Sequence, residues 1–303
     1  MDKPFALLIE DDRDVADLFN HVLDMAGYHS GIVYDGLEAM KQLTSNPPDV
    51  VLLDLQLPGI SGVDILQKMR ADERMENIPV VVITAYANSA KRLPIKPDLF
   101  LLKPVDIHDL GNLLQSLREK TDQLREPPYD TVTHLYTESY FSVRLIFPLE
   151  RVKRLELEHF GVLFAELHPF RNIQEKLAED VLNALLRKMA DHFRGLLPSS
   201  DILAWSNSGC FFSLFEEIPT DDLPSETAKS VSQGLNDFLE LHDVGEGLRM
   251  QTGVVLCDDG YKGVQEILND VDFARNFVKS QPEAGNRVYT REEIHQMRRD
   301  TVS

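Results

Sequence analysis

The chain has 303 residues, 43% of them hydrophobic and 27% charged, which is typical of a soluble protein with two folded domains. Its formal net charge of −19 argues against direct binding to nucleic acid or to a membrane, because such a surface repels phosphate groups. Two cysteines, Cys210 and Cys257, are too few for a disulfide framework or a cysteine-based metal site. No apolar run could span a bilayer and no signal peptide precedes the first strand-like segment, so we expect a cytoplasmic protein.

The first 126 residues alternate short apolar runs with amphipathic segments. Unbroken runs rich in Val, Ile and Leu are typical of strands in a parallel sheet that helices cover on both faces. The alternation therefore predicts a doubly wound α/β domain, whose site lies at the carboxyl ends of its strands. We predict a helix at Val15–Ala26 and strands at Phe5–Ile9, Val50–Leu53, Val80–Ile83 and Leu99–Leu102.

A long helical pattern with regularly spaced leucines runs from Asp106 to Arg125 and stops before Pro127 and Pro128. Proline lacks the amide donor of a helix and restricts the residue before it, so the helix must end there. We place the domain boundary at this point, with a first domain at 1–126 and a second at 127–303. The helix holds fewer than about three heptads, which favours core packing and a rigid spacer over a coiled coil.

The second domain mixes helices with adjacent antiparallel strands, which indicates an α+β fold. Ile202–Ser206 and Cys210–Phe215 read as a hairpin closed by the turn between them. The remaining predicted elements are strands at Gly161–Leu167, Met250–Cys257 and Val288, and helices at Ile173–Phe193, Ser225–His242 and Gly263–Lys279.

Polar side chains follow four of the predicted strands of the first domain. Glu10 and Asp11 follow the first strand, Asp54 the third, Thr84 the fourth and Lys103 the fifth. Grouped carboxylates repel one another unless a cation lies between them, and oxygen ligands of this kind suit Mg²⁺. The metal and the lysine neutralise a moving phosphoryl group, and a hydroxyl donates to its oxygen. This set predicts phosphoryl transfer to Asp54, with Mg²⁺ as the cofactor.

These residues stand in four motifs that resemble the response-regulator receiver family over residues 3–120. The resemblance implies a flavodoxin-like fold with a five-stranded parallel sheet. It makes Asp54 the phosphorylation site, Asp11 the direct metal ligand, Glu10 its acidic neighbour and the Gln56 backbone carbonyl a third contact to the metal. The motifs are "LLIEDD" at 7–12, "VVLLDLQLPGISG" at 50–62, "VVVITAY" at 80–86 and "FLLKPV" at 100–105.

The same resemblance implies that Thr84 and Lys103 bind the phosphoryl group. Phe100 stands where the family keeps a rotating switch aromatic, although an ordinary core phenylalanine is the alternative. Asp12, the third acid of the first motif, is expected to cap the following helix instead. One departure from the family is clear, because Pro94 and Pro97 shorten the helix after Thr84 to roughly 87–93.

The second half resembles the GGDEF family of diguanylate cyclases over about residues 129–290, with the order and spacing of its framework. The resemblance implies a nucleotidyl-cyclase-like fold. The segments that carry it are 129–141, 162–171, the hairpin at 201–215 and the closing helix and strand at 272–288.

The chemistry of that family is largely missing, because its Gly-Gly-(Asp/Glu)-Glu-Phe signature reads Asn207-Ser208-Gly209-Cys210-Phe211 here. Asn207 and Ser208 replace the two glycines that let the nucleotide phosphates approach the backbone in that family. The thiol of Cys210 replaces the second acid of the signature. The two metal-binding aspartates become Glu166 and His168, a poor metal pair by themselves. The guanine-reading residues become Gln174 and Asn183, and the product-inhibition motif reads 198–201 without its arginine. We expect no cyclase activity.

The resulting hypothesis is a two-component response regulator, phosphorylated by a sensor histidine kinase, whose degenerate GGDEF-like domain signals to a downstream protein partner. Self-association along the helix at 106–125 as a homodimer is the other way to transmit the signal. Two alternatives concern the second domain, namely a GTP sensor without turnover and a weak residual cyclase. Arg171, Lys279 and Arg287 suit phosphates in either, but surface cations are the simpler interpretation.

Overall fold

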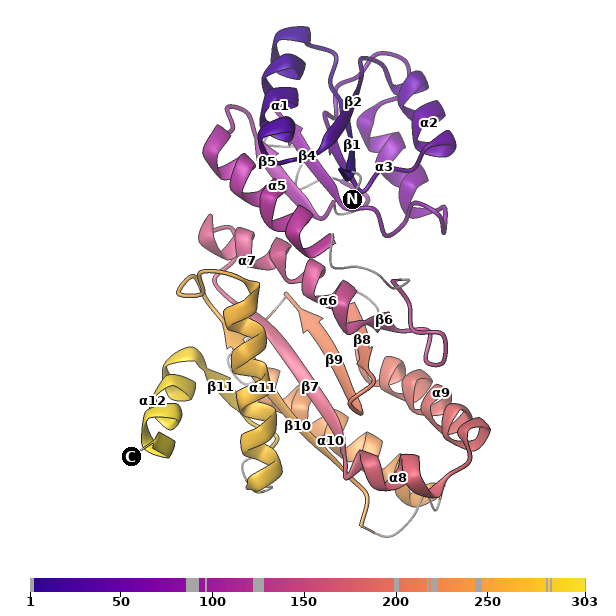
Figure 1. Ribbon diagram of the computed structural model, residues 1–303, viewed down its shortest axis with the longest axis vertical. Coiled ribbons are helices and arrows are strands. Elements are labelled where there is room, and N and C mark those ends of the chain that lie inside the picture. The colour runs from indigo at the N-terminus through magenta and orange to yellow at the C-terminus, as the bar shows by residue number, and fades with distance from the viewer. Residues whose placement is uncertain are drawn as a thin grey trace. The chain divides into compact units, whose positions relative to one another are not determined.

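A computed structural model of the chain divides into two compact units, Met1–Gln123 and Leu124–Ser303, and each unit has its own sheet (Figure 1). None of the described helices is long and apolar enough to cross a membrane. The structure describes residues 3–85, 93–95, 97–121, 128–198, 202–216, 218, 223–242, 247–281, 283 and 285–302.

The first unit contains a five-stranded sheet in which all pairs are parallel and the strand order is β2-β1-β3-β4-β5. Every residue of β3 and β4 is buried, as their unbroken apolar runs predict for strands covered on both faces. The predicted doubly wound fold is therefore confirmed. The strands are β1 (Phe5–Ile9), β2 (His29–Val33), β3 (Val50–Leu53), β4 (Val80–Thr84) and β5 (Leu99–Leu102).

Helices cover both faces of this sheet, with α1 against α5 on one face and α2 against α3 on the other (Figure 1). The leucine stripe of the last helix packs into the core, since Leu110, Leu113, Leu114 and Leu117 are buried. The short helix predicted at 87–93 lies outside the described residues except for its last position. The helices are α1 (Arg13–Met25), α2 (Gly36–Ser45), α3 (Gly62–Arg70) and α5 (Ile107–Thr121).

The second unit contains a six-stranded mixed sheet with the order β11-β10-β7-β9-β8-β6. β8 and β9 form the predicted hairpin, in which Ser206 lies opposite Cys210. β7 lies between β10 and β9 and is antiparallel to both, so its side chains are at the centre of the sheet. The strands are β6 (Tyr136–Thr137), β7 (Phe160–His168), β8 (Ile202–Ser206), β9 (Cys210–Phe215), β10 (Arg249–Cys257) and β11 (Val288–Thr290).

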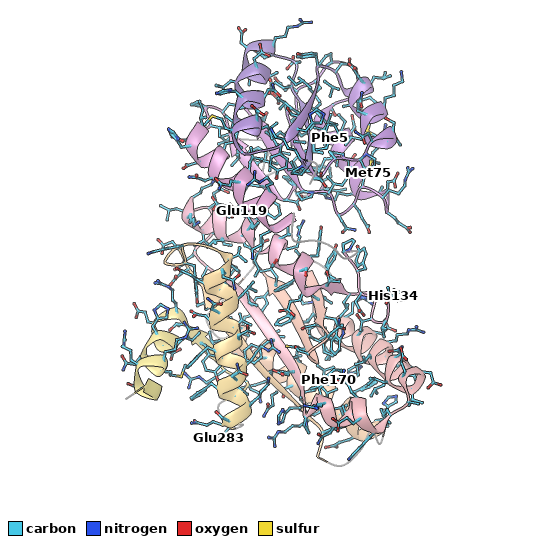
Figure 2. The ribbon with its side chains drawn as sticks, in the orientation of Figure 1. Phe5, Met75, Glu119, His134, Phe170 and Glu283 are labelled. Atoms are coloured by element: carbon cyan, nitrogen blue, oxygen red, sulfur yellow. The ribbon has the colours of Figure 1, made fainter. Side chains whose placement is uncertain are left out.

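Alternate residues of this sheet face two helix layers. Leu163 and Leu167 of β7 share one core with α9 and α10, whereas Phe212 of β9 stacks on Phe141 of α6 at 5.5 Å on the other face. Side chains fill the space between the sheet and the helices (Figure 2). The helices are α6 (Glu138–Arg144), α7 (Ile146–Lys153), α8 (Phe170–Lys176), α9 (Glu179–Leu196), α10 (Leu223–Leu241), α11 (Val264–Ser280) and α12 (Arg291–Val302).

The prediction of one long helix over Ile173–Phe193 is wrong. The chain is extended at Leu177 and Ala178, so α8 ends and α9 begins there, and both helices contribute apolar residues to the same core. The prediction also omitted α6, α7 and α12. A capping box marks the start of α12, where Thr290 and Glu293 each accept a hydrogen bond from the other's backbone N–H.

Candidate functional site

The carboxyl ends of β1 and β3 bring three acidic side chains together. Carboxylate oxygens of Glu10, Asp11 and Asp54 lie within 4.8 Å of one another, and no other group of three or more His, Cys, Asp or Glu side chains meets this criterion among the described residues. Glu10 and Asp54 are buried, with 2% and 7% of their surface exposed, while Asp11 is open to solvent. The arrangement is the one expected for residues that follow neighbouring parallel strands.

Backbone hydrogen bonds fix the two buried acids. The Glu10 N–H donates to Val33 O at 3.1 Å, and the Asp54 N–H donates to Ile9 O at 2.9 Å, so the ladder of the sheet continues through both residues. Asp12 lies outside the cluster as predicted, because its side chain caps α1 and accepts from the Asp14 N–H at 2.9 Å.

Lys103, which follows β5, reaches both buried acids. Its Nζ donates to Glu10 Oε1 and Oε2 at 2.9 and 2.7 Å and to Asp54 Oδ2 at 2.6 Å. Burial alone would lower the pKa of Lys103, but its bonds to Asp54 and Glu10 raise that pKa above its ordinary value. Burial is also the main reason that the pKa of Glu10 is raised. The ammonium therefore stays charged, and it is a single positive charge against three carboxylates.

Thr84 places an unused hydroxyl at the end of β4. The residue is fully buried, and its Oγ1 has no hydrogen-bond partner in the described part of the chain. The Thr84 carbonyl accepts from the Lys103 N–H at 2.9 Å, which holds the ends of β4 and β5 together. A buried hydroxyl without a partner costs about 1–3 kcal/mol.

The donor set of this pocket fits a hard divalent cation. Three carboxylates supply oxygen ligands and excess negative charge, and both are what Mg²⁺ requires. Gln56 lies beside the pocket, where its N–H donates to Asp54 Oδ1 at 3.0 Å. Phe100 is half-buried against the core of the first unit, which fits either of its two interpretations.

The corresponding site of the second unit is organised differently. Glu166 of β7 is buried, and its Oε2 accepts from Arg275 Nε at 3.1 Å while its Oε1 lies 2.7 Å from Lys279 Nζ. Both cations project from α11. Two positive charges thus meet one buried acid, and Lys279, predicted as a cation for phosphates, is already paired in this structure.

The signature hairpin turn is tied to the same helix. Ser208 accepts from Arg275 Nη2 at 3.1 Å and lies 3.0 Å from the Ser206 hydroxyl. Gly209 adopts a φ of +92°, and a Cβ at this position would lie 2.4 Å from the Phe170 ring, so only glycine fits without strain. Phe170, labelled in Figure 2, begins α8 and packs edge-on to Trp205.

Cys210 stands opposite Glu166 in the pairing of β9 with β7. It is completely buried, and burial raises the pKa of its thiol well above the ordinary value. The sulfur is therefore protonated and neutral, which makes it a poor ligand for Mg²⁺. His168 is the last residue of β7 and is half-buried.

Several other predicted positions lie apart from this network. Arg171 is exposed and pairs with Glu175 on its own helix, and Arg287 pairs with Glu293. The guanine-reading positions Gln174 and Asn183 lie on separate helices, α8 and α9, and residues 199–201 of the product-inhibition motif lie outside the described residues.

Sequence reasoning missed Arg275. The signal was available, because Arg275, like Asp270, interrupts the apolar buried face of α11, which is formed by Ile267, Val271, Ala274 and Val278. An arginine on such a face needs a buried acid nearby.

Family models match the chain in two places. One model, the response regulator receiver domain, matches residues 6–115. The other, the diguanylate cyclase GGDEF domain, matches residues 128–284, which is more than half of the chain. The chain belongs to the GGDEF family. Its GGDEF domain follows a receiver domain, and both predicted resemblances are therefore confirmed at the level of the family.

The curated relatives named here match only a part of the chain. The chain is 32% identical over 124 residues to the DNA-binding dual master transcriptional regulator RpaA of Synechocystis, which covers 40% of this chain and 52% of RpaA. The chain thus spans about half the length of that relative. Identity to the polar-differentiation response regulator DivK of Brucella ovis is 29% over 104 residues, covering 33% of this chain and 85% of DivK.

Solved structures include a receiver domain of the sensor histidine kinase PA1611 from Pseudomonas aeruginosa, with a magnesium ion coordinated in its active site cleft. It is 28% identical to this chain, covers 37% of this chain and 95% of its own, and has a TM-score of 0.35.

Proposed function

We propose that this chain is a cytoplasmic response regulator that accepts a phosphoryl group on Asp54 from a sensor histidine kinase. Its GGDEF domain is catalytically inactive and serves as a protein-interaction module, so that phosphorylation of the receiver domain controls the binding of a downstream protein. The receiver domain preceding a cyclase-type domain supports the general scheme of two-component signalling.

One observation carries the phosphoryl-accepting part of the proposal. Lys103 joins the buried acids Glu10 and Asp54, and the buried hydroxyl of Thr84 is without a partner among the described residues at the adjacent strand end. A phosphoryl group on Asp54 would accept from both Lys103 and Thr84, which satisfies the unused donor.

The residues of the receiver pocket divide the reaction between them. Asp54 is the nucleophile, and its carboxylate is held by Gln56 N–H on Oδ1 and by Lys103 on Oδ2. The bond from an aspartate oxygen to phosphorus forms as the phosphorus–nitrogen bond of a phosphohistidine breaks, and the histidine leaves with the electron pair. Glu10, Asp11 and Asp54 would hold Mg²⁺, with the Gln56 carbonyl as a further ligand, and Mg²⁺ when bound neutralises charge on the transferring group.

The loss of cyclase activity is supported by the residues in the second site. The family's reaction needs acids that hold metal ions, but Cys210 is a buried neutral thiol and Glu166 is already neutralised by Arg275 and Lys279. The Ser208 side chain stands in a turn whose glycine the family uses for close approach of phosphates. With these groups the 3′-hydroxyl of GTP has no activated route to an α-phosphate.

Labelling tests the receiver part directly. A small phosphodonor with Mg²⁺ should add one base-labile acyl phosphate per chain, and Asp54→Ala should abolish it. Asp17→Ala is the matched control, because Asp17 is an exposed acid on α1 away from the strand ends, and it should label like wild type. Labelling of Asp54→Ala at the wild-type level would refute Asp54 as the acceptor.

Partner capture tests the signalling part. Full-length chain is used as bait with and without the phosphodonor, and Asp54→Ala is used in parallel. A protein retained only by the phosphorylated wild-type bait supports the proposed module, whereas the same set of proteins on all baits argues against phosphorylation control.

A residual cyclase is the second candidate, since membership of the GGDEF family favours it. Incubation of the full chain with GTP and Mg²⁺ or Mn²⁺, followed by chromatography, should yield no cyclic di-GMP on our account. Calorimetry with GTP distinguishes a sensor without turnover, because such a sensor would release or absorb heat on binding and yet make no product.

A further inference from the structure

Glu166 poses a physical problem that the fold has to solve. Its carboxylate is 4% exposed at the centre of a six-stranded sheet, and a buried ion is strongly unfavourable unless an opposite charge lies beside it. On the neighbouring strands it faces Cys210 and Gln251, which are uncharged. The opposite charge therefore has to come from a bound cation or from another element of the domain.

Arg275 supplies that charge in a fixed geometry. Its Nε donates to Glu166 Oε2 at 3.1 Å, one terminal nitrogen donates to Asp272 Oδ1 at 3.0 Å, and the other donates to Ser208 Oγ at 3.1 Å. The guanidinium also lies over the Phe212 ring, 5.4 Å from its centroid. Every nitrogen has a partner, and the side chain is 8% exposed, so it does not swing away freely.

The donor set leaves no place for a metal ion at Glu166. Arg275 takes one carboxylate oxygen and Lys279 takes the other, and the burial of Cys210 keeps its thiol protonated. A divalent cation would have to displace a guanidinium that has three hydrogen-bonded neighbours. It would then meet one buried carboxylate, still paired with Lys279, and the exposed Asp272, whereas Mg²⁺ prefers several oxygen ligands. The magnesium that the GGDEF family implies does not fit these residues.

We propose that Arg275 takes the place of the metal cation in this GGDEF domain, so that Glu166 is kept as one half of an internal ion pair and the domain folds without a divalent ion. The guanidinium joins α11 to β7 and to the turn between β8 and β9. This inference deepens the proposed function, because it gives the physical reason for the loss of catalysis and rests on that loss.

The fluorescence of Trp205 makes the inference testable in the full-length chain. Trp205 is the only tryptophan and is buried in β8, so its emission reports the unfolding of the GGDEF domain without a signal from the receiver domain. Mn²⁺ added to the wild-type protein should leave the midpoint of this thermal transition unchanged. A rise with Mn²⁺ that disappears in Glu166→Gln would overturn the proposal, because it would show a metal on Glu166.

Variants of Arg275 then test whether this residue replaces a metal cation or is only an ion-pair partner of Glu166. Arg275→Met should lower the Trp205 midpoint by about 10 °C, because it removes the more deeply buried of the two cations that pair with Glu166 and leaves only Lys279. Mn²⁺ should restore part of that loss in Arg275→Met but none in Arg275→Met/Glu166→Met, where the carboxylate is gone. If Mn²⁺ restores nothing, Arg275 is only a structural partner and the proposal fails.

One further variant and one comparison of stabilities keep the test valid if Arg275→Met fails to fold. Arg275→Lys keeps the charge and should unfold at a midpoint between those of wild type and Arg275→Met. Arg275→Met/Glu166→Met should be more stable than Arg275→Met alone, since it buries no unpaired ion, and the reverse order would contradict the pairing. These results are distinguishable from a failure of the proposed function, which would appear as product from GTP or as the absence of any phosphorylation-dependent partner.

Discussion

The receiver domain and the GGDEF domain each bury a carboxylate and each bring a cation to it, but the balance of charge differs. In the receiver domain three carboxylates cluster together, and the single ammonium of Lys103 pairs with two of them, Glu10 and Asp54. In the GGDEF domain Arg275 and Lys279 both pair with the buried carboxylate of Glu166, and Arg275 also pairs with the exposed Asp272. The first site keeps a negative excess, whereas the second has none.

This difference teaches that the chemistry of a site depends on its balance of charge more than on the presence of an acid. A site with excess carboxylates remains able to attract Mg²⁺, while a site with internal cations has already satisfied its acid. The unused hydroxyl of Thr84 fits the same contrast, because in the GGDEF domain the hydroxyl of Ser208 already has Arg275 as a partner.

The largest effect is expected from removing the cation of the receiver pocket. Lys103→Met should slow labelling by a small phosphodonor roughly 100-fold, because it removes a preorganised donor from the transferring group. Lys68→Met, at an exposed position on α3, is the matched control and should label at the wild-type rate. Equal rates for Lys103→Met and Lys68→Met would mean that the contact with Asp54 has no role in the transfer.

Magnesium should stabilise one domain and leave the other unchanged. At about 100 times its dissociation constant, a ligand that binds only the folded state adds about 2.7 kcal/mol to the free energy of unfolding. Calorimetry should show this gain in the receiver transition and its loss in Asp11→Asn, which removes the exposed metal ligand. If Mg²⁺ did not stabilise the receiver domain of the wild-type chain against unfolding, the proposed metal site would be contradicted.

The Thr84 hydroxyl should lower the stability of the receiver domain and speed the phosphorylation of Asp54. Thr84→Val removes a buried polar atom without a described partner, so the free energy of unfolding of the receiver domain should rise by about 1–2 kcal/mol. Labelling should slow about 10-fold, because the phosphoryl group loses a donor. Thr252→Val is the contrasting control, since the buried Thr252 hydroxyl donates to Ala228 O at 3.0 Å and its removal should destabilise the GGDEF domain. A loss of stability in Thr84→Val would show that its hydroxyl has a partner in the unliganded state.

The smallest effect should come from the acid that caps α1. Asp12→Ala should lower the free energy of unfolding by about 1 kcal/mol, because the Asp14 and Val15 N–H groups lose their acceptor. Labelling of Asp54 should be unaffected, which separates this carboxylate from its neighbour Asp11. Impaired labelling in a folded Asp12→Ala protein would place Asp12 in the pocket.

Much of the receiver domain could be predicted from the sequence, because strands buried in a parallel sheet have unbroken apolar sequences. The bounds of β1, β3 and β5 were predicted to the residue, and parallel pairing is what brings residues 10, 54 and 103 to one edge. The residues that meet there follow from topology alone. Their hydrogen bonds, and the absence of one from the Thr84 hydroxyl to any described residue, do not.

The GGDEF domain was harder to predict, since its ion pairs join residues far apart in the chain. Glu166 and Arg275 are separated by 109 positions, and nothing local to either residue names the other. The division of Ile173–Phe193 into α8 and α9 was also missed, because both halves keep a helical pattern and the break depends on packing. The acidic pair at the start of α9 was the available sign of a new helix.

Counting bound metal ions tests the central contrast most directly. Full-length chain is titrated with Mn²⁺ and the free ion is measured by electron paramagnetic resonance. We predict one ion per wild-type chain, none in Asp11→Asn and one in Glu166→Gln. Two ions per wild-type chain, or one that persists in Asp11→Asn and is lost in Glu166→Gln, would contradict the account.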